Sequence, residues 1–299
     1  MACSTHEYKF IGEMIVFICA IIGFLGSLSI ILLYAFFPQL RSYSFRLILY
    51  IGIFNFIQSL STVLSYIHIN NTALCDFFAM IFHSAYLSST IWSGSIALNL
   101  FLVVRYGLRD FTRFHKLWLF TTSVFIPGIF ALPIITGSYG HVGYYCSFKE
   151  DTVGNIWRFS IYYGVIWTCA LAICTFYLIV FFDLKKMHIA PNTRIIIERL
   201  MMYPIIVVII LIPLTLLRLH VFNKGDCEEY YLSIFSGSLQ ALVGFFNAVI
   251  YTYTSDVKKC IKEKVKAKSV IEIPRASLSV GSSQGPNLLE ESFKDSIEI

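Results

Sequence analysis

The chain has 299 residues, of which 57% are hydrophobic and 14% are charged, and its formal net charge is +5. A soluble globular domain is about 45–50% apolar and about 25% charged, so this composition excludes an ordinary soluble fold. Lysines and arginines lie beside apolar blocks instead of forming a basic patch, which argues against a nucleic-acid partner.

Seven apolar segments are long enough to cross the roughly 30 Å hydrocarbon layer as helices. They are residues 14–37, 47–67, 77–104, 117–135, 156–182, 200–219 and 230–253. We therefore expect an all-α membrane protein in which residues 14–253 form a seven-transmembrane helix bundle. Lysine and arginine gather on one side of these segments. By the positive-inside rule, residues 1–13 are extracellular and the C-terminus is cytoplasmic, with the plasma membrane as the expected location.

Two further segments follow the last span. In residues 254–268, Val257, Ile261 and Val265 recur every four residues among lysines, which predicts a short amphipathic eighth helix on the lipid bilayer. Cys260 in this segment is a palmitoylation candidate. Residues 269–299 lack apolar periodicity and are rich in serine, which indicates a disordered cytoplasmic tail.

The predicted topology places several modifiable residues outside. Cys75 lies at the outer mouth of the third span and Cys146 lies in the loop after the fourth. Two such cysteines either form a disulfide or remain thiols. Cys3 and Cys227 are a second pair with the same two possibilities. Asn70 opens a glycosylation sequon, although its closeness to the membrane argues against its use.

Three amides, Asn55, Asn99 and Asn247, interrupt the second, third and seventh spans at a similar depth from the inner side. Polar groups inside the hydrocarbon layer face the interior of a helix bundle, because unpaired polar groups are costly in lipid. We expect the three amides to share one hydrogen-bonded layer. That layer is either a switch or a static link between helices.

Arg105 and Tyr106 close the third span at its inner end. An arginine there either contacts a cytoplasmic partner or anchors the helix on the positive side of the membrane. Pro204, which follows Tyr203 in the sixth span, predicts a kink that can act as a hinge.

Cationic and aromatic residues collect toward the outer side of the third, fifth and sixth spans. They either line a pocket for an extracellular small molecule or belong to the aromatic belt of the membrane interface. These residues are His83, Tyr86, Trp157, Arg158, Tyr163, Arg218 and His220.

The sequence lacks the patterns of catalytic and metal sites. No cluster of histidine, cysteine and carboxylates has metal-ligand spacing, no glycine-rich phosphate loop is present, and no nucleophile–base pair stands out. We therefore expect no enzymatic activity, no metal and no cofactor.

Three stretches resemble heptahelical G-protein-coupled receptors, and within them class E, the slime-mould cyclic-AMP receptors and their relatives. They are residues 199–204 with Pro213 in the sixth span, residues 238–240 and 244–248 with Tyr251 in the seventh, and Cys75 with residues 140–146 at the outer disulfide. The resemblance extends over residues 14–268.

The chain departs from the rhodopsin-like class of these receptors at two motifs. Val104 stands where that class has an acidic residue before the arginine, so the acidic lock beside Arg105 is absent. Ala248 follows Asn247 where that class has proline, so we expect no proline bend in the seventh helix. Both departures fit class E better and leave the ligand open.

The resemblance implies a receptor that passes an extracellular small-molecule signal to a heterotrimeric G protein, with cyclic nucleotides among the candidate ligands. It also implies a disulfide between Cys75 and Cys146, and phosphorylation of the tail by a receptor kinase, with arrestin as a further partner. The residues implied in coupling and switching are Arg105, Tyr106, Asn55, Asn99, Tyr203, Pro204, Asn247 and Tyr251.

The main alternative is a seven-span small-solute transporter of the PQ-loop kind, which Pro38-Gln39 suggests. That fold repeats the dipeptide in its second half, and no other Pro-Gln occurs in this chain. A retinal pump or channel needs a lysine in its last span, and residues 230–253 contain none. A non-signalling scaffold remains compatible with the sequence.

Overall fold

The computed structural model describes residues 6–67, 72–108, 112–142, 145–186, 191–220, 227–254, 257, 258 and 260. Of residues 6–9, 112–113, 191–199, 218–220 and 227–230 it describes the backbone alone. The chain divides into two compact units, Met1–Cys260 and Ile261–Ile299, and the described residues all belong to the first.

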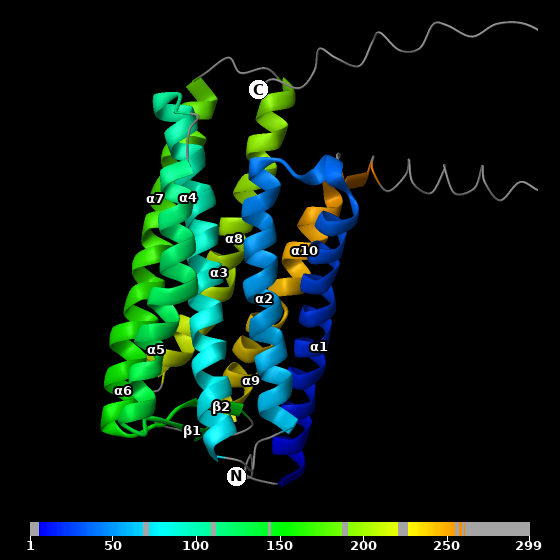
Figure 1. Cartoon of the computed structure of the whole chain (residues 1–299). Helices are drawn as coiled ribbons and strands as arrows, with labels where there is room; N and C mark the ends of the chain where they lie inside the picture. Colours follow the sequence, from blue (N-terminus) through cyan, green and yellow to red (C-terminus); the bar gives the residue numbers. More distant parts are fainter. Residues whose placement is uncertain are drawn as a thin grey trace, which may run out of the picture. The chain divides into compact units, whose positions relative to one another are not determined.

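Helices dominate the described part, and the long ones run roughly side by side (Figure 1). The α-helices are α1 (His6–Phe36), α2 (Tyr43–Ile67), α3 (Thr72–Tyr106), α4 (Thr112–Phe120), α5 (Ile126–Ile135), α6 (Thr152–Trp157), α7 (Gly164–Lys186), α8 (Pro191–His220), α9 (Cys227–Ala241) and α10 (Val243–Tyr253). The shorter elements are η1 (Pro38–Leu40), η2 (Thr121–Phe125), η3 (Arg158–Tyr163), β1 (Tyr139–Val142) and β2 (Tyr145–Phe148).

Six helical stretches in the described part are long and apolar enough to cross a membrane. They are Phe10–Phe36, Tyr43–Ile67, Thr72–Tyr106, Phe114–Ile135, Thr152–Lys186 and Leu200–Leu217. The bent pair Tyr231–Ala241 and Val243–Tyr253 passes the same test jointly, so the number is seven if this pair forms one span. The protein is thus a helical membrane bundle, as predicted.

The helices extend beyond the segments that apolarity predicted. α1 begins at His6, well before residue 14, and α8 begins at Pro191, well before residue 200. The reason is that hydropathy marks only the part of a helix inside the hydrocarbon layer, whereas backbone hydrogen bonding continues into its polar ends.

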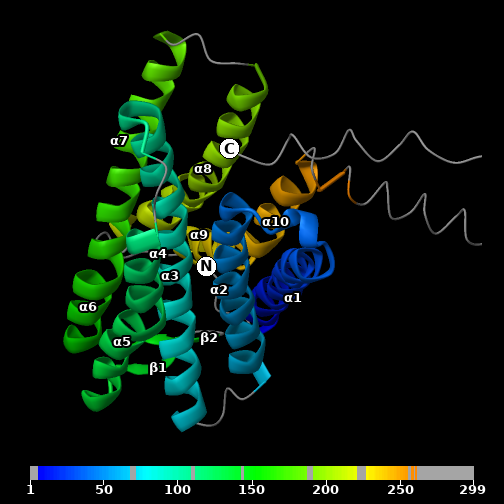
Figure 2. The ribbon, with the colours of Figure 1, turned by 45° about the horizontal axis from the view of Figure 1, so that its top comes forward.

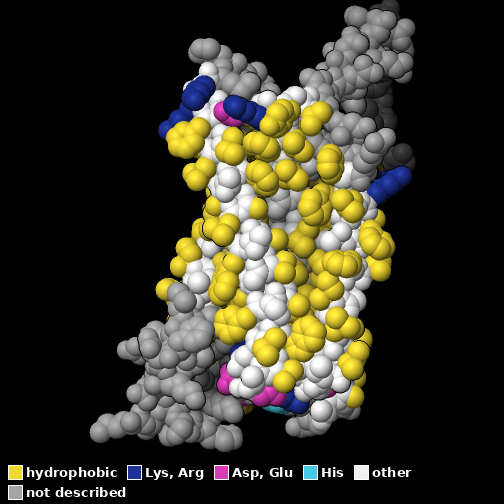
Figure 3. Space-filling view, turned by 90° about the vertical axis from the view of Figure 1, so that its left-hand side faces the viewer, with side chains coloured by type: hydrophobic (Ala, Val, Ile, Leu, Met, Phe, Trp, Pro, Cys, Tyr) yellow, Lys and Arg dark blue, Asp and Glu magenta, His cyan; other side chains and the backbone are white. Residues whose placement is uncertain are grey.

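Large apolar side chains on the outside of the bundle agree with a lipid environment. Leu171 and Phe182 on α7 and Phe125 in η2 are exposed. Figure 3 shows hydrophobic side chains along this face and charged side chains toward its two ends. An apolar band between charged ends is the surface that a bilayer requires.

α3 packs against α2, α5, α7 and α8. Both ribbon views place it between α2 on one side and α4 and α7 on the other (Figures 1 and 2). Its buried face is rich in small residues, among them Ser88, Ser89 and Ser93, which let neighbouring helices approach closely. Ser88 Oγ donates to the backbone oxygen of Thr122 at 3.1 Å, which ties α3 to η2.

π-helical turns interrupt two of the spans. η2 joins α4 to α5, and η3 joins α6 to α7. Such turns widen a helix locally and change the direction of the side chains that they carry. Arg158, Tyr162 and Tyr163 lie on η3, and all three are buried in the bundle.

A small hairpin departs from the all-α prediction. β1 pairs with β2 antiparallel, so that Tyr139 faces Phe148 and His141 faces Cys146. The predicted disulfide between Cys75 and Cys146 is present, with the two Cα atoms 5.3 Å apart, and it fixes the hairpin to the start of α3. Figure 1 shows the hairpin at the same end of the bundle as the beginning of α1.

The last two helices meet at Leu242 with an angle of 41° between them. As predicted, there is no proline at this position, but the two helices are bent relative to each other nonetheless. α1 approaches this point very closely: a Cβ at Gly244 would collide with Gly23 O and Ser27 Oγ, and one at Gly23 would collide with Ala241 O. Backbone contact that only glycine permits therefore accompanies the bend.

Candidate functional site

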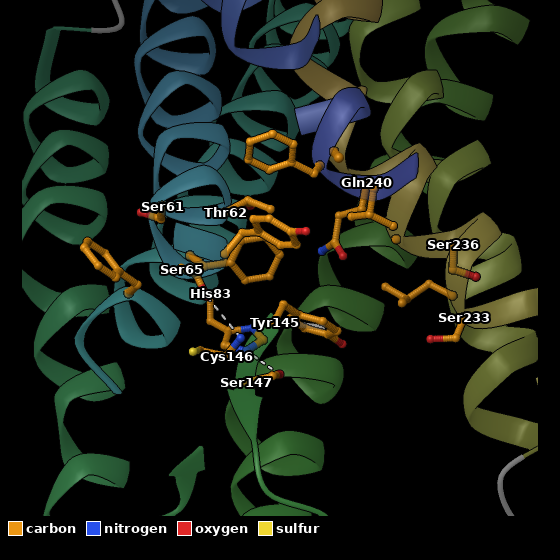
Figure 4. A pocket seen from close by; sticks show the side chains of 18 of the residues that line it. Ser61, Thr62, Ser65, His83, Tyr145, Cys146, Ser147, Ser233, Ser236 and Gln240 are labelled. Carbon is orange, nitrogen blue, oxygen red and sulfur yellow. Dashed lines mark hydrogen bonds between the residues drawn. The ribbon is translucent and has the colours of Figure 1, made fainter. Parts of the chain in front are cut away.

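A cavity opens among α1, α2, α3, η3, α8, α9 and β2. Its volume is about 60 Å³, measured as the space that the centre of a water-sized sphere can occupy. One water needs roughly 10–15 Å³ on this measure, so the cavity has room for a small molecule. Its polar lining includes Ser61, Thr62, Ser65, His83, Ser147, Arg158, Ser233, Ser236 and Gln240. In Figure 4, Ser61, Thr62 and Ser65 lie on one side and Ser233 and Ser236 on the other.

The hairpin forms one wall of the cavity and is held by polar contacts on two helices. The backbone nitrogen of Cys146 donates to Ser65 Oγ on α2 at 3.1 Å. His83 Nε2 on α3 and Ser147 Oγ are hydrogen-bonded at 3.0 Å, as the dashed line in Figure 4 shows. With the disulfide, these bonds fix β2 over the cavity.

Behind this wall lies a cluster of buried aromatic rings. Tyr139 OH donates to the backbone oxygen of Phe130 at 2.9 Å. Burial, together with the negative charge of Asp76, raises the pKa of Tyr139 above its ordinary value, so this phenol stays protonated and can donate. The ring of His83 lies 4.7 Å from that of Phe148, between centroids, and belongs to the same cluster.

Arg158 is buried and lines the cavity, but its guanidinium also holds the hairpin. Its NH2 nitrogen donates to the backbone oxygen of Phe148 and, at 3.3 Å, to that of Lys149. The widened turn η3 brings this side chain inward. The backbone carbonyl groups at the end of β2 therefore compensate part of the positive charge of Arg158.

Gln240 joins three helices at the inner wall of the cavity. Its Nε2 donates to Tyr162 OH at 2.8 Å, and its backbone oxygen accepts from Gln58 Nε2 at 3.2 Å. Gln240 is also the second residue before the bend at Leu242. Any molecule that moves Gln240 therefore acts directly beside the break between α9 and α10.

Two buried polar atoms in this region have no hydrogen-bond partner among the described residues. They are Ser236 Oγ, on a side chain that is 1% exposed and lines the cavity, and Gln58 Oε1. Buried polar atoms in native proteins are nearly always satisfied, by protein, water or ligand. Ser236 Oγ lines the cavity and is therefore available to a bound molecule, whereas Gln58 does not line it.

Only part of the predicted pocket is brought together. His83, Arg158 and Tyr163 line the cavity. Tyr86 instead packs into the core, with its ring centroid 6.0 Å from that of Tyr162. Trp157 lies just before η3 and donates to Thr136 Oγ1 at 3.0 Å, away from the cavity. The side chains of Arg218 and His220 lie outside the described residues.

Sequence reasoning missed the contributions of α1, α2 and α9. The missed lining residues include Glu13, Ser61, Thr62, Ser65, Ser233, Ser236 and Gln240. The signal was present on α2, where polar residues at 58, 61, 62 and 65 follow the spacing of one helix face. Such a polar stripe in a span indicates a face turned to a polar interior.

At the other end of the bundle, Arg105 forms an ion pair that the sequence did not suggest. Its NH1 nitrogen lies 3.2 Å from Asp183 Oδ1 at the end of α7. Val104 supplies no acidic group beside the arginine, as predicted, but a carboxylate from another helix takes that position. The two side chains are 57% and 15% exposed, so the pair stabilises the structure only weakly.

The three amides do not form one layer in the described structure. Asn55 Oδ1 accepts from Ser89 Oγ at 2.6 Å, and Asn99 Nδ2 donates to Tyr43 OH at 3.3 Å. Both bonds link α2 to α3, whereas Asn247 is buried on α10 and bonds to neither of the other amides. The depth of a residue along a span does not fix its direction around the helix, which explains the difference.

Two tyrosines of the predicted switch, Tyr203 and Tyr251, are buried in the bundle. The hydroxyl groups of Tyr203 and Tyr251 have no hydrogen-bond partner in the part of the chain that is described. Pro204 lies in the interior of α8, next to Tyr203. Tyr106, in contrast, is exposed at the end of α3.

The other predicted sites are described only in part. The residues outside the described part are Asn70, Cys3, most of residues 254–268 and the whole tail. The side chain of Cys227 is also outside it. Val257 is buried and Cys260 half-buried. Among the described residues, no group of histidine, cysteine and carboxylate side chains could hold a metal ion.

Comparison with known proteins finds two receptors. The chain is 23% identical over 261 residues to G-protein coupled receptor 1 of Arabidopsis thaliana, an alignment that covers 82% of this chain and 78% of that protein. It is also 23% identical over 261 residues to cyclic AMP receptor-like protein A of Dictyostelium discoideum, covering 83% of this chain and 67% of that protein. No family model matches the chain. The predicted resemblance to receptors of this kind is confirmed.

Proposed function

We propose that the chain is a seven-span G-protein-coupled receptor that passes an extracellular small-molecule signal to a heterotrimeric G protein. The single observation that carries the proposal is the polar cavity beneath a disulfide-anchored hairpin, in a membrane bundle similar to two named receptors. A cavity with hydroxyl, amide and aromatic groups is typical of small-molecule sites.

The proposed topology places the hairpin and its disulfide outside the cell, where disulfides persist. In it, residues 1–13 are extracellular, α9 and α10 form one bent seventh span, and residues 14–253 form the bundle. Residues 254–268 are the proposed amphipathic eighth helix, with Cys260 as a palmitoylation candidate, and residues 269–299 the cytoplasmic tail. Serines in that tail would be substrates for a receptor kinase and, once phosphorylated, a docking site for arrestin.

The route from ligand to G protein runs through Gln240 and the bend. A ligand that contacts Gln240 or Ser236 would favour one of two arrangements of α9 against α10. α10 carries Asn247 and Tyr251 and ends at Tyr253. The unpartnered hydroxyls of Tyr203 and Tyr251 would gain partners in a second arrangement, which supplies free energy for a switch.

The inner ends of α3 and α7 would control access of the G protein. In the described state Arg105 is paired with Asp183. The active state would release the arginine toward the G protein, with Tyr106 exposed beside it. Asn55 and Asn99 would keep α2 on α3 while α8, which carries Pro204, moves.

Nucleotide exchange on purified G proteins tests the proposal. The receptor would be reconstituted in lipid nanodiscs, and GTP uptake by a panel of heterotrimers would be measured during a ligand screen that includes cyclic AMP. We expect stimulated exchange, and its loss in Arg105→Ala and Asn247→Ala. Solute flux into vesicles, without exchange on any G protein, would instead support the transporter alternative, to which the relatives lend no support.

A further inference from the structure

One wall of the cavity carries a carboxylate near the start of α1. Glu13 belongs to α1 and lies within the apolar stretch Phe10–Phe36. It lines the cavity together with Val16 and Phe17, which follow at three and four residues and so share its helix face. A carboxylate that lines a cavity beside apolar side chains needs a polar or cationic partner.

The carboxylate of Glu13 has neither an ion pair nor a hydrogen bond within the described part of the chain. The cationic side chain in the cavity lining is Arg158, which binds backbone oxygens of the hairpin and makes no ion pair with Glu13. The α1 side of the cavity therefore presents a negative charge that the described residues leave without a counter-charge.

Aromatic rings stand beside this carboxylate. Phe17 and Tyr66 both line the cavity, and their ring centroids are 4.6 Å apart. Tyr66 OH also lies 3.6 Å from Met14 Sδ, which holds α2 against α1 at the level of Glu13. A carboxylate next to aromatic rings attracts organic cations, because ring faces and the carboxylate are both negative in potential.

Polar groups that can bind uncharged parts of a molecule lie on α9. Ser236 Oγ is buried, unpartnered among the described residues and part of the lining, and Gln240 is next to it around the helix. A molecule with an ammonium group at one end and hydroxyl or carbonyl groups at the other would satisfy Glu13 and Ser236 together.

We propose that the cavity takes a small organic amine, whose ammonium group binds Glu13 against Phe17 and Tyr66 and whose polar end meets Ser236 and Gln240. This proposal rests on the proposed receptor function, since it names the ligand class of the same cavity. It predicts a preference for cations that the anionic cyclic nucleotides do not satisfy.

The test measures direct binding and needs no G protein. Thermal stabilisation of the full chain in nanodiscs would be titrated with a matched series: tyramine (a cation), tyrosol (its neutral alcohol) and 4-hydroxyphenylacetate (an anion), beside choline and cyclic AMP. The variants are Glu13→Gln and, as a matched control, Glu150→Gln, an exposed acid that does not line the cavity.

In the unmodified chain we expect an amine to bind more tightly than tyrosol and 4-hydroxyphenylacetate. Glu13→Gln weakens the amine by about tenfold or more, since hydrogen bonds to a charged group are the stronger kind, and leaves tyrosol unchanged. Retained tyrosol binding shows that the variant is folded. Glu150→Gln changes no affinity.

Three results would overturn the proposal: no stabilisation by either amine, amine binding that ignores Glu13→Gln, or equal or tighter binding of the anions. The outcome is separable from that of the receptor proposal. Amine binding that depends on Glu13, without nucleotide exchange on any G protein, would contradict the receptor proposal alone. Nucleotide exchange stimulated by cyclic AMP would contradict the amine proposal alone.

Discussion

Gln240 connects the candidate ligand cavity with the bend between α9 and α10. Its amide bonds Tyr162 on η3, its backbone oxygen bonds Gln58 on α2, and the bend follows at Leu242. At the residue scale, the function therefore depends on whether this amide senses the occupant of the cavity.

The bond between Gln240 and Tyr162 can be tested from both sides. Gln240→Leu and Tyr162→Phe each leave one buried polar group unpaired, so each should lower the free energy of unfolding by about 1–3 kcal/mol. The double variant should cost less than the sum of the two, because the second change leaves nothing further unpaired. Thermal unfolding in detergent measures all three, and strict additivity would mean that the bond contributes nothing.

Asp183→Asn tests the pair with Arg105. A partly exposed ion pair of this kind stabilises a structure by about 0.2–1 kcal/mol. Because the described state contains the pair, its loss should raise ligand-independent nucleotide exchange by up to about fivefold. The readout is basal GTP uptake by the G protein. Glu150→Gln, on the hairpin side of the bundle, serves as the control. Unchanged or lower basal exchange would show that the pair does not hold an inactive state.

At the scale of elements, the contact between α1 and the bend is made of glycine. Gly244→Ala should lower the free energy of unfolding by about 1–3 kcal/mol, since its Cβ would meet Gly23 O and Ser27 Oγ. Gly128→Ala on α5 is the matched control, because no atom lies within 4 Å of the added Cβ. That change should be neutral or stabilising by up to about 1 kcal/mol. Equal effects on thermal stability would argue against a tight α1–α10 contact.

The hairpin depends on its covalent link to α3. Removing the disulfide with Cys75→Ser and Cys146→Ser should cost about 2–4 kcal/mol of stability and loosen β2 over the cavity. Cys169→Ser, which alters a half-buried thiol, should change little. Reduction with dithiothreitol should reproduce the double variant. A melting temperature insensitive to reductant would contradict a structural role for this bond.

The spans were predictable and the contacts between them were not. Hydropathy depends on each segment alone, so the run from Phe10 to Phe36 marks a helix wherever its neighbours lie. The bend at Leu242 accompanies contact with Gly23, and the partner of Arg105 is Asp183, so both depend on residues far away in the chain. The hairpin likewise depends on anchoring to Cys75 and Ser65. The cavity depends on such distant contacts. Of the expected pocket residues whose side chains the structure describes, His83, Arg158 and Tyr163 line it, and Tyr86 and Trp157 do not.

At the scale of the whole molecule, the bent pair decides how the chain sits in the membrane. If α9 and α10 cross together, the spans number seven and the two ends of the chain lie on opposite sides. If the pair instead enters and returns on one side, six spans bring both ends to the same side. The 41° angle is modest, and both halves are apolar, which favours a single bent crossing.

Epitope tags at the two ends distinguish these topologies. Antibody labelling of intact cells should detect an N-terminal tag, and a C-terminal tag should be labelled only after the membrane is permeabilised, because lysine and arginine predominate on the C-terminal side. A third tag inserted within residues 221–226, between α8 and α9 in the sequence, should be accessible from outside, since this position precedes the bent pair. If the C-terminal tag were also labelled on intact cells, the bent pair would not cross. The inner ends of α3 and α10 would then lack the common cytoplasmic face that a G protein needs.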